Sequence, residues 1–385
     1  MRKNILLNLL LFAMAITACG QNPRNNQLKL KSSTTASVMP DYKLDEDIGE
    51  MLMVGFRGLS IDKDNHIIRD IKEYHVGSVI LFEYDAPTGK HRRNISDMKQ
   101  LTNLCASLQK LADNNLLIGV DQEGGKVSRL KSEYGFSAIP SAKTMAKGGN
   151  DTLSHYATLT ASMLRKAGIN LDFAPVADVD VNPQCPVIGK LGRSFSSDPN
   201  EVELCCRIWL ETFKKNSIIG CLKHFPGHGS ATGDTHQGLV DISDSWTEQE
   251  LIPYRHLIEQ NLVPMIMTGH LMVRQLDEKY PTSLSHNVNT SILRDELGFQ
   301  GVIITDDLAM GAITKQYGFE EAIRLAIMAG VDLLCLSNNG AKYDADIVPT
   351  TVKIIKQMVE QGDISPKQIH LSAERIRKLK KQVMQ

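Results

Sequence analysis

Short apolar runs alternate with amphipathic segments along the chain from about Leu44 onward. The apolar runs are hydrophobic at nearly every position, which is typical of strands in a parallel sheet that helices cover. Eight segments have this pattern: 51–56, 76–83, 116–121, 169–176, 218–224, 264–268, 301–306 and 332–336. They predict eight buried parallel strands.

The segments between these runs place apolar residues at helical spacing, on one face each. The clearest are 95–112, 153–167, 201–215, 247–260 and 320–329, and residues 365–385 have the pattern of a basic amphipathic C-terminal helix. This alternation predicts an α/β fold, a (β/α)8 TIM-type barrel that forms a single domain over 44–385. An open doubly wound sheet is the alternative. Against it, no Gly-x-Gly-x-x-Gly turn follows the first strand.

Composition narrows the class of protein. The chain has 385 residues, 42% of them hydrophobic and 23% charged, with a formal net charge of −1. These values are ordinary for a globular protein, and they supply no long-range positive field to attract nucleic acid. We therefore expect no nucleic-acid partner, and we expect a monomer.

The N-terminus has the three-part form of an export signal. Met1-Arg2-Lys3 is basic, residues 5–16 are almost wholly apolar, and Thr17-Ala18 leads into Cys19. The apolar run is too short for a stable transmembrane helix. Residues 16–19 resemble a bacterial lipobox, so we expect 1–18 to be a lipoprotein signal peptide. A plain signal peptide or a short anchor is the alternative.

In this interpretation Cys19 carries the lipid, and 19–43 is a flexible tether rich in Asn, Ser, Thr and Lys. The protein would be lipid-anchored in the cell envelope, on the outer membrane facing the periplasm or the surface, and would contact membrane through this anchor only. Gly20 and Gln21 do not resemble an inner-membrane retention signal.

The six remaining cysteines are scattered without Cys-x-x-Cys spacing. Cys221 and Cys335 lie inside apolar runs, where a small buried hydrophobe is the more common role. We therefore predict free thiols, no disulfide framework and no cysteine metal site.

Titratable residues are most concentrated in 223–236. This stretch reads Lys-His-Phe-Pro-Gly-His-Gly and continues to Asp234-Thr235-His236, so one cation, three imidazoles and a carboxylate fall within fourteen residues. Gly227, Gly229 and Gly233 permit close approach of the backbone, and Pro226 stiffens the turn. The pattern predicts side chains held in a fixed arrangement for catalysis.

Other polar residues follow different strands of the predicted barrel. Asp121 and Glu123 follow the third strand, Lys223 and His224 the fifth, His270 the sixth, and Asp306 and Asp307 the seventh. These positions share the face where active sites of this fold lie. For Glu123, Asp178 and Asp307 we expect the more ordinary role of capping a helix or accepting hydrogen bonds from loop amides.

Three segments in this order resemble glycoside hydrolase family 3, most closely its bacterial β-N-acetylglucosaminidases (β-hexosaminidases). The segments are 121–129, 223–236 and 305–310, and the resemblance runs from about Leu44 to the C-terminus. It implies a (β/α)8 domain and a retaining mechanism. Lys126 stands where the family often has Arg, and Ser230-Ala231 replaces the commoner Asp-Thr.

The resemblance also implies roles for individual residues. Asp306 matches the nucleophile, His236 the general acid/base, and Asp234 the carboxylate that pairs with it. The positions that hold the sugar before the scissile bond match Asp121, Arg129, Arg193, Lys223 and His224.

These residue types suit retaining hydrolysis. The reaction needs one carboxylate to form a glycosyl-enzyme and a second group that protonates the leaving oxygen and later deprotonates water. Histidine titrates near neutrality and can take the second role, with Asp234 orienting its imidazole. Two residues apart is not a helical contact spacing, so Asp234 and His236 must meet through a turn, and the loop that carries them could be mobile.

The implied activity is removal of terminal β-linked N-acetylglucosamine from glycans or peptidoglycan fragments, with no cofactor. Within enzymes, the alternatives are a β-N-acetylglucosaminide phosphorylase, a β-glucosidase of the same family and a metal-dependent hydrolase. The last would use His224, His228, His270 and Asp234 as ligands, but the first strand lacks the His-x-His of such barrels. A non-catalytic sugar-binding lipoprotein is the alternative from another class.

Overall fold

Eight parallel strands form the centre of the molecule. The computed structural model describes residues 42–235 and 237–383, which belong to one compact unit. The strands pair in the order β13-β11-β9-β8-β5-β2-β1-β14. Their bounds are β1 (Leu52–Gly55), β2 (Ser78–Ile80), β5 (Leu117–Val120), β8 (Leu171–Asp172), β9 (Ile219–Phe225), β11 (Met265–Thr268), β13 (Val302–Thr305) and β14 (Leu334–Leu336). Seven of these strands lie within a predicted strand, and β9 extends one residue beyond the predicted 218–224.

The two ends of this order meet, so the sheet closes into a barrel. Ile304 of β13 forms a parallel bridge with Leu333, directly before β14, and Thr305 N donates to Leu333 O at 3.2 Å. All other neighbouring strands also pair in parallel. The predicted (β/α)8 barrel is confirmed, and the open doubly wound sheet is wrong.

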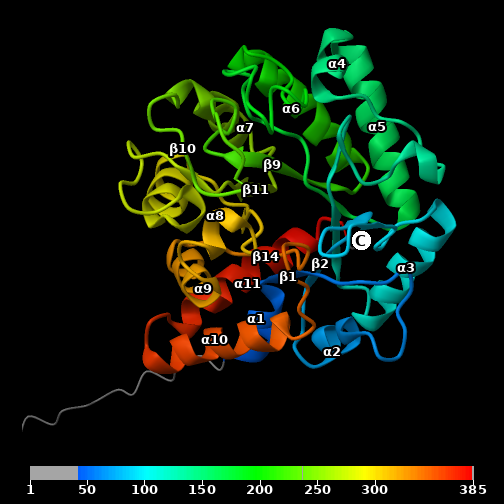
Figure 1. Ribbon diagram of the computed structural model, residues 1–385, viewed down its shortest axis with the longest axis vertical. Coiled ribbons are helices and arrows are strands. Elements are labelled where there is room, and N and C mark those ends of the chain that lie inside the picture. Colours follow the sequence, from blue (N-terminus) through cyan, green and yellow to red (C-terminus); the bar gives the residue numbers. More distant parts are fainter. Residues whose placement is uncertain (1–41, 236, 384–385) are drawn as a thin grey trace, which may run out of the picture. The chain divides into compact units, whose positions relative to one another are not determined.

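Helices surround the strands (Figure 1). The main ones after successive strands are α2 (His66–Lys72), α3 (Met98–Leu111), α5 (Gly149–Ala167), α6 (Pro199–Lys215), α7 (Ile252–Glu259), the π-helix η4 (Asn287–Glu296), α9 (Phe319–Met328) and α10 (Ile347–Gln361). The five clearest predicted helices are all present. Predicted helix 247–260 is divided into a short 3₁₀ segment, η2 (Glu248–Leu251), and α7, because Pro253 favours the first turn of a new helix.

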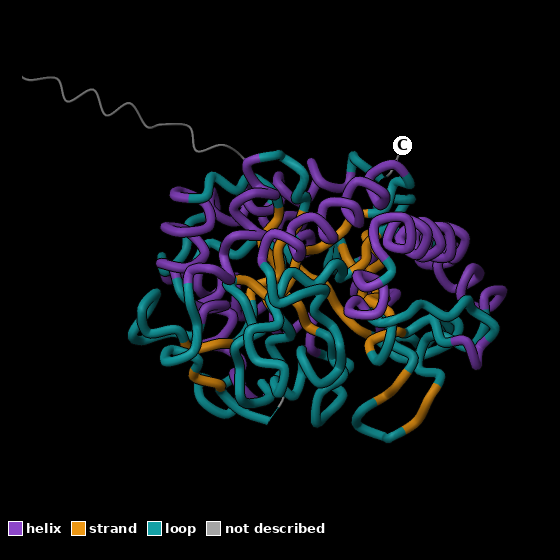
Figure 2. Tube along the Cα trace, turned by 90° about the horizontal axis from the view of Figure 1, so that it is seen from above, coloured by secondary structure: helices purple, strands orange, loops and turns teal. Residues whose placement is uncertain are grey.

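Long loops and small pairs of strands lie beyond the ends of the barrel strands. The small pairs are β3 (Tyr84–Asp85) with β4 (Lys90–His91), β6 (Gln122–Gly124) with β7 (Val127–Ser128), and β10 (Val240–Asp241) with β12 (Leu271–Met272). The short helices there are η1 (Ser132–Tyr134), α4 (Ala142–Lys147), η3 (Thr282–Leu284) and α8 (Gly311–Thr314). Figure 2 shows the loops gathered on the side away from the C-terminus.

Two helices pack together near the chain ends. Helix α1 (Leu44–Glu50) leads into β1, and α11 (Pro366–Lys380) lies against it, which confirms the predicted C-terminal helix. Lys380 is 1% exposed, forms an ion pair with Glu50 and donates to Asn115 O at 3.0 Å. A buried ammonium thus fixes α11 to the barrel.

Replacing Lys380 with methionine is expected to destabilise the fold by about 3–5 kcal/mol, because it leaves the Glu50 carboxylate buried without its cation. Urea unfolding measures the change. Lys381→Met changes an exposed lysine next to it and should stay within about 0.5 kcal/mol of wild type. Equal stability of the Lys380→Met and Lys381→Met variants would contradict this role of the ion pair.

All six cysteines of the described residues are buried and free, as predicted. Cys19 and the predicted signal and tether up to residue 41 lie outside the described residues. Within 42–235 and 237–383, no helix combines the length and apolarity that crossing a bilayer requires.

Candidate active site

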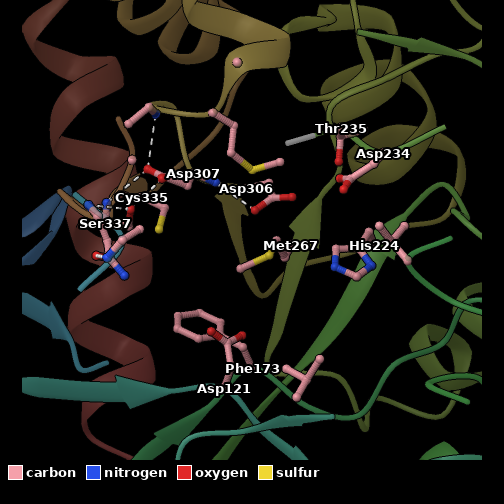
Figure 3. Close-up of a pocket in the computed structure, with 18 of the residues that line it drawn as sticks. Asp121, Phe173, His224, Asp234, Thr235, Met267, Asp306, Asp307, Cys335 and Ser337 are labelled. Atoms are coloured by element: carbon pink, nitrogen blue, oxygen red, sulfur yellow. Dashed lines mark hydrogen bonds between the residues drawn. The ribbon is translucent and has the colours of Figure 1, made fainter. Parts of the chain in front are cut away.

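A pocket of about 830 Å³ opens at the carboxyl ends of the strands. It is lined by seven of the predicted site residues: Asp121, Arg129, Arg193, Lys223, His224, Asp234 and Asp306. Figure 3 shows Asp306 and Asp234 in its upper part and Asp121 near the bottom. The eighth, His236, lies outside the described residues, but its neighbour Thr235 also lines the pocket.

Asp306 directly follows β13 and projects into the pocket (Figure 3). Its backbone N donates to Thr268 O at 2.9 Å, and its Oδ1 accepts from Asp307 N at 2.8 Å. These bonds fix the backbone and orient the carboxylate. The side chain is half-buried, so a ligand in the pocket can reach it.

Asp307, unlike Asp306, uses its carboxylate to bind neighbouring loop residues. Its Oδ1 accepts from Ala309 N and Ser337 N, at 3.1 and 3.0 Å, and its Oδ2 accepts from the Ser337 hydroxyl. Burial raises the pKa of Asp307. The expected role, accepting hydrogen bonds from loop amides, is confirmed, and these bonds hold the turn after β13 next to the end of β14.

Lys223, at the end of β9, is the centre of a buried charged cluster. Its Nζ lies 2.8 Å from Asp121 Oδ1 and 2.7 Å from Glu123 Oε1. Burial would lower the pKa of Lys223, but the two carboxylates outweigh it and raise that pKa. Burial likewise opposes ionisation of Asp121, but Lys223 and Arg129 lower its pKa well below the ordinary value. The cluster is therefore fully charged at neutral pH.

Arg193 connects this cluster to His224. The Arg193 guanidinium binds Glu123 through two bonds of 2.7 Å, and its Nη2 lies 3.5 Å from His224 Nε2. On the other side of the ring, His224 Nδ1 lies 2.7 Å from Asp178 Oδ2, so Asp178 and Arg193 together orient the imidazole.

Glu123 and Asp178 were both expected to cap a helix or to accept hydrogen bonds from loop amides, and both have other partners as well or instead. Glu123 accepts from two cationic side chains rather than from loop amides, so that prediction was wrong. Asp178 does accept from the backbone N of His224 and His228, at 3.0 and 2.8 Å, and it also orients the His224 ring. Burial would raise the pKa of Asp178, but His224 outweighs it and lowers that pKa to about 2.

The glycine-rich loop after β9 packs tightly against its neighbours. A Cβ at Gly229 would lie 1.6 Å from Val179 O, so only glycine fits there. Trp246 Nε1 donates to Pro226 O at 3.1 Å. The predicted close backbone approach is thus present at Gly229, although the neighbour is protein backbone rather than a ligand.

Two buried acids near the site were not predicted. Glu250 is fully buried beneath the loop, its Oε2 accepts from Gly229 N at 3.1 Å, and burial raises its pKa to about 7. Asp172, at the end of β8, accepts from Gln122 N at 2.8 Å, and burial raises its pKa well above the ordinary value. Neither is among the residues that line the pocket, so each contributes to the site through the backbone that it holds.

The histidines considered as metal ligands lie in other environments. His270 is fully buried, with Nδ1 2.6 Å from the Ser283 hydroxyl and Nε2 2.9 Å from Asp307 O. His228 is buried edge-on to His224, and burial lowers its pKa to about 4. Among residues 42–235 and 237–383, no three His, Cys, Asp or Glu side chains are grouped so as to hold a metal ion.

Known proteins are similar to this chain in sequence. Residues 43–379 match the family described as Glycosyl hydrolase family 3 N terminal domain. A beta-hexosaminidase of Tolumonas auensis is 35% identical over 296 residues, which cover 75% of this chain and 83% of that protein. Beta-hexosaminidase A of Pseudoalteromonas piscicida is 31% identical over 339 residues, which cover 82% of this chain.

Solved structures agree with the sequence comparison. The glycoside hydrolase family 3 beta-N-acetylglucosaminidase from Paenibacillus sp. str. FPU-7 superposes with a TM-score of 0.78 at 33% identity, over 88% of this chain. This chain spans 62% of that structure and 55% of the Pseudoalteromonas protein, so it is shorter than both relatives. The family match extends over nearly all described residues. The chain therefore belongs to glycosyl hydrolase family 3, and the part of that family which it matches is the N-terminal domain.

Proposed function

We propose that the protein is a retaining exo-β-N-acetylglucosaminidase. The observation that carries the proposal is one pocket that is lined by Asp306, Asp234 and the charged side chains Asp121, Arg129, Arg193 and Lys223. Figure 3 shows Asp121 below Asp306 and Asp234 in this pocket. Relatives at 31–35% identity are named beta-hexosaminidases, which supports the sugar class.

In this mechanism Asp306 attacks the anomeric carbon as the leaving oxygen takes a proton from His236. The product is a glycosyl-enzyme ester on Asp306 and a free aglycone. His236 then removes a proton from water, which attacks the same carbon and releases Asp306. Asp234 stabilises the imidazolium in the first step, as carboxylates do in other acid/base pairs.

The charged cluster suits recognition of a neutral sugar. Lys223 and Arg193 carry two positive charges, and Asp121 and Glu123 carry two negative ones, so these four groups leave no net charge for the ligand to neutralise. Each group keeps a fixed position in a buried site and offers hydrogen bonds to hydroxyl groups. We therefore assign Asp121, Arg129, Arg193, Lys223 and His224 to holding the sugar ring.

Hydrolysis rates on three substrates test the proposal: an aryl β-N-acetylglucosaminide, the matching aryl β-glucoside and a disaccharide muropeptide, each with and without phosphate. We expect cleavage of both N-acetylglucosaminides, slow cleavage of the glucoside and no dependence on phosphate. A rate that needs phosphate and yields a sugar phosphate would identify a phosphorylase instead. Preference for the glucoside would identify a β-glucosidase. Absence of cleavage of all three substrates would favour a non-catalytic sugar-binding protein.

We further propose that the protein is exported and is anchored in the cell envelope through a lipid on Cys19. Peptidoglycan fragments are the glycans accessible at that location. The basic start, apolar run and small residues before Cys19 support this location.

Cys19→Ser should move the protein from the detergent phase to the aqueous phase in a detergent partition assay, because lipid chains contribute about 0.8 kcal/mol of membrane binding per buried CH₂ group. The processed variant should keep its specific activity. Asn22→Ala, three residues further on, is the matched control and should stay in the detergent phase. Unchanged partition of Cys19→Ser would show that the N-terminus anchors the protein differently.

A further inference from the structure

We propose that Lys315 is a positioning residue that holds the acid/base loop over the nucleophile. Lys315 Nζ donates to Gln237 O at 3.0 Å. This hydrogen bond joins the segment after Asp306 to the segment that carries Asp234 and His236. The inference rests on the proposed function, because it gives the bond a role in placing the acid/base pair.

Lys315 follows a short helix that is packed against the rest of the fold. This helix is α8, which begins five residues after Asp306, and Ala312 and Ile313 of α8 are buried to 1% and 0% exposure. The turn before α8 is fixed by the bonds of Asp307 to Ala309 N and Ser337 N. The backbone of Lys315 is therefore held in a constant position relative to the nucleophile strand.

The loop that it contacts is anchored at both ends but bridges open pocket between them. At one end Ala231 O accepts from Asn182 Nδ2 at 2.9 Å. At the other, Val240 pairs with Leu271 in the small β10–β12 sheet. Between these anchors Asp234 and Thr235 line the pocket.

The carbonyl that Lys315 contacts belongs to Gln237, which is close in sequence to both proposed acid/base residues. Gln237 N donates to Asp234 O at 3.0 Å, so these two residues, which flank Thr235 and His236 in the sequence, are held together. Lys315 bonds to the carbonyl of the residue that directly follows His236 in the sequence. Lys315 itself lines the pocket together with Asp234 and Asp306, so its ammonium can hold this part of the loop close to Asp306.

The experiment compares Lys315→Met, which keeps the aliphatic stem, with Lys315→Arg, which keeps the donor. The matched control is Lys342→Met. Lys342 is exposed, follows the pocket residue Ala341, and forms no side-chain hydrogen bond or ion pair with the described residues. For each variant we would measure cleavage of a disaccharide and the burst rate of glycosylation by an activated aryl N-acetylglucosaminide. The same change would be repeated in a His236→Ala background.

We expect Lys315→Met to slow disaccharide cleavage about tenfold, the order of magnitude of one charge-assisted hydrogen bond. The aryl burst rate should be unchanged, since an activated leaving group needs no acid. Lys315→Arg should restore most of the disaccharide rate, and Lys342→Met should match wild type. In the His236→Ala background, Lys315→Met should add no further loss, because the group it positions is already absent.

Equal losses on both substrates would make Lys315 a binding or structural residue and overturn the inference. A wild-type rate on the disaccharide, or a further loss in the His236→Ala background, would also overturn it. Failure of the proposed function has a different signature, in which the wild-type enzyme does not cleave N-acetylglucosaminides or the Asp306→Ala variant keeps its activity.

Discussion

Replacing Asp306 with alanine is expected to abolish turnover while the barrel stays folded. Without its carboxylate no glycosyl-enzyme forms, and loss of a nucleophile in other hydrolases lowers kcat by at least about 10⁴. The fold should tolerate the change, because Asp306 is only half-buried and its side chain lines the pocket rather than the core. Steady-state hydrolysis and circular dichroism measure the two properties.

Asp307→Asn is the matched control for this prediction. Asparagine keeps the oxygen that accepts from Ala309 N and Ser337 N, so we expect a loss in kcat below about tenfold, within the range of one neutral hydrogen bond. A larger loss in Asp307→Asn than in Asp306→Ala would mean that the nucleophile is misassigned.

His236→Ala is expected to lower disaccharide cleavage by about 10² to 10⁴, the usual contribution of general acid/base catalysis. Glycosylation by an activated aryl sugar should be spared, because that leaving group departs without a proton. The second step still needs a base to deprotonate water, so the variant should accumulate glycosyl-enzyme. Azide should restore turnover, since it attacks without a proton to remove. Burst kinetics with and without azide measure these effects.

Asp234→Asn should show a smaller defect of the same kind, because the imidazole remains but its protonated form loses a compensating charge. His155→Ala changes an exposed histidine on α5 and should match wild type. Equal losses of the His236→Ala variant on good and poor leaving groups, without a burst or azide rescue, would contradict the acid/base assignment.

The sequence was most informative about the strands and the residues that end them. Each strand run is buried on both faces, so it is hydrophobic at successive positions and is recognisable without knowledge of its neighbours. The carboxyl ends of parallel barrel strands meet on one face, so the sequence alone places Asp121, Lys223 and Asp306 together.

Partners across the loops could not be predicted in the same way. Glu123 and Arg193 are 70 residues apart, and their ion pair depends on how two long loops fold. Glu250 lies in a Thr-Glu-Gln-Glu segment that resembles the solvated first turn of a helix, and no local pattern reveals its burial beneath Gly229. Lys315 gave no signal either, because an exposed lysine at the end of a short helix is common.

Trapping the covalent intermediate would show which residue is the nucleophile. An N-acetylglucosaminyl fluoride with a second fluorine at C5 forms the glycosyl-enzyme but slows its hydrolysis, so the modified residue can be identified by peptide mass spectrometry. We expect one sugar per chain, on Asp306, with loss of activity that recovers as the ester hydrolyses. A label on Asp121, Asp234 or Asp307, or turnover without a covalent intermediate, would contradict the assignment of Asp306 as the nucleophile.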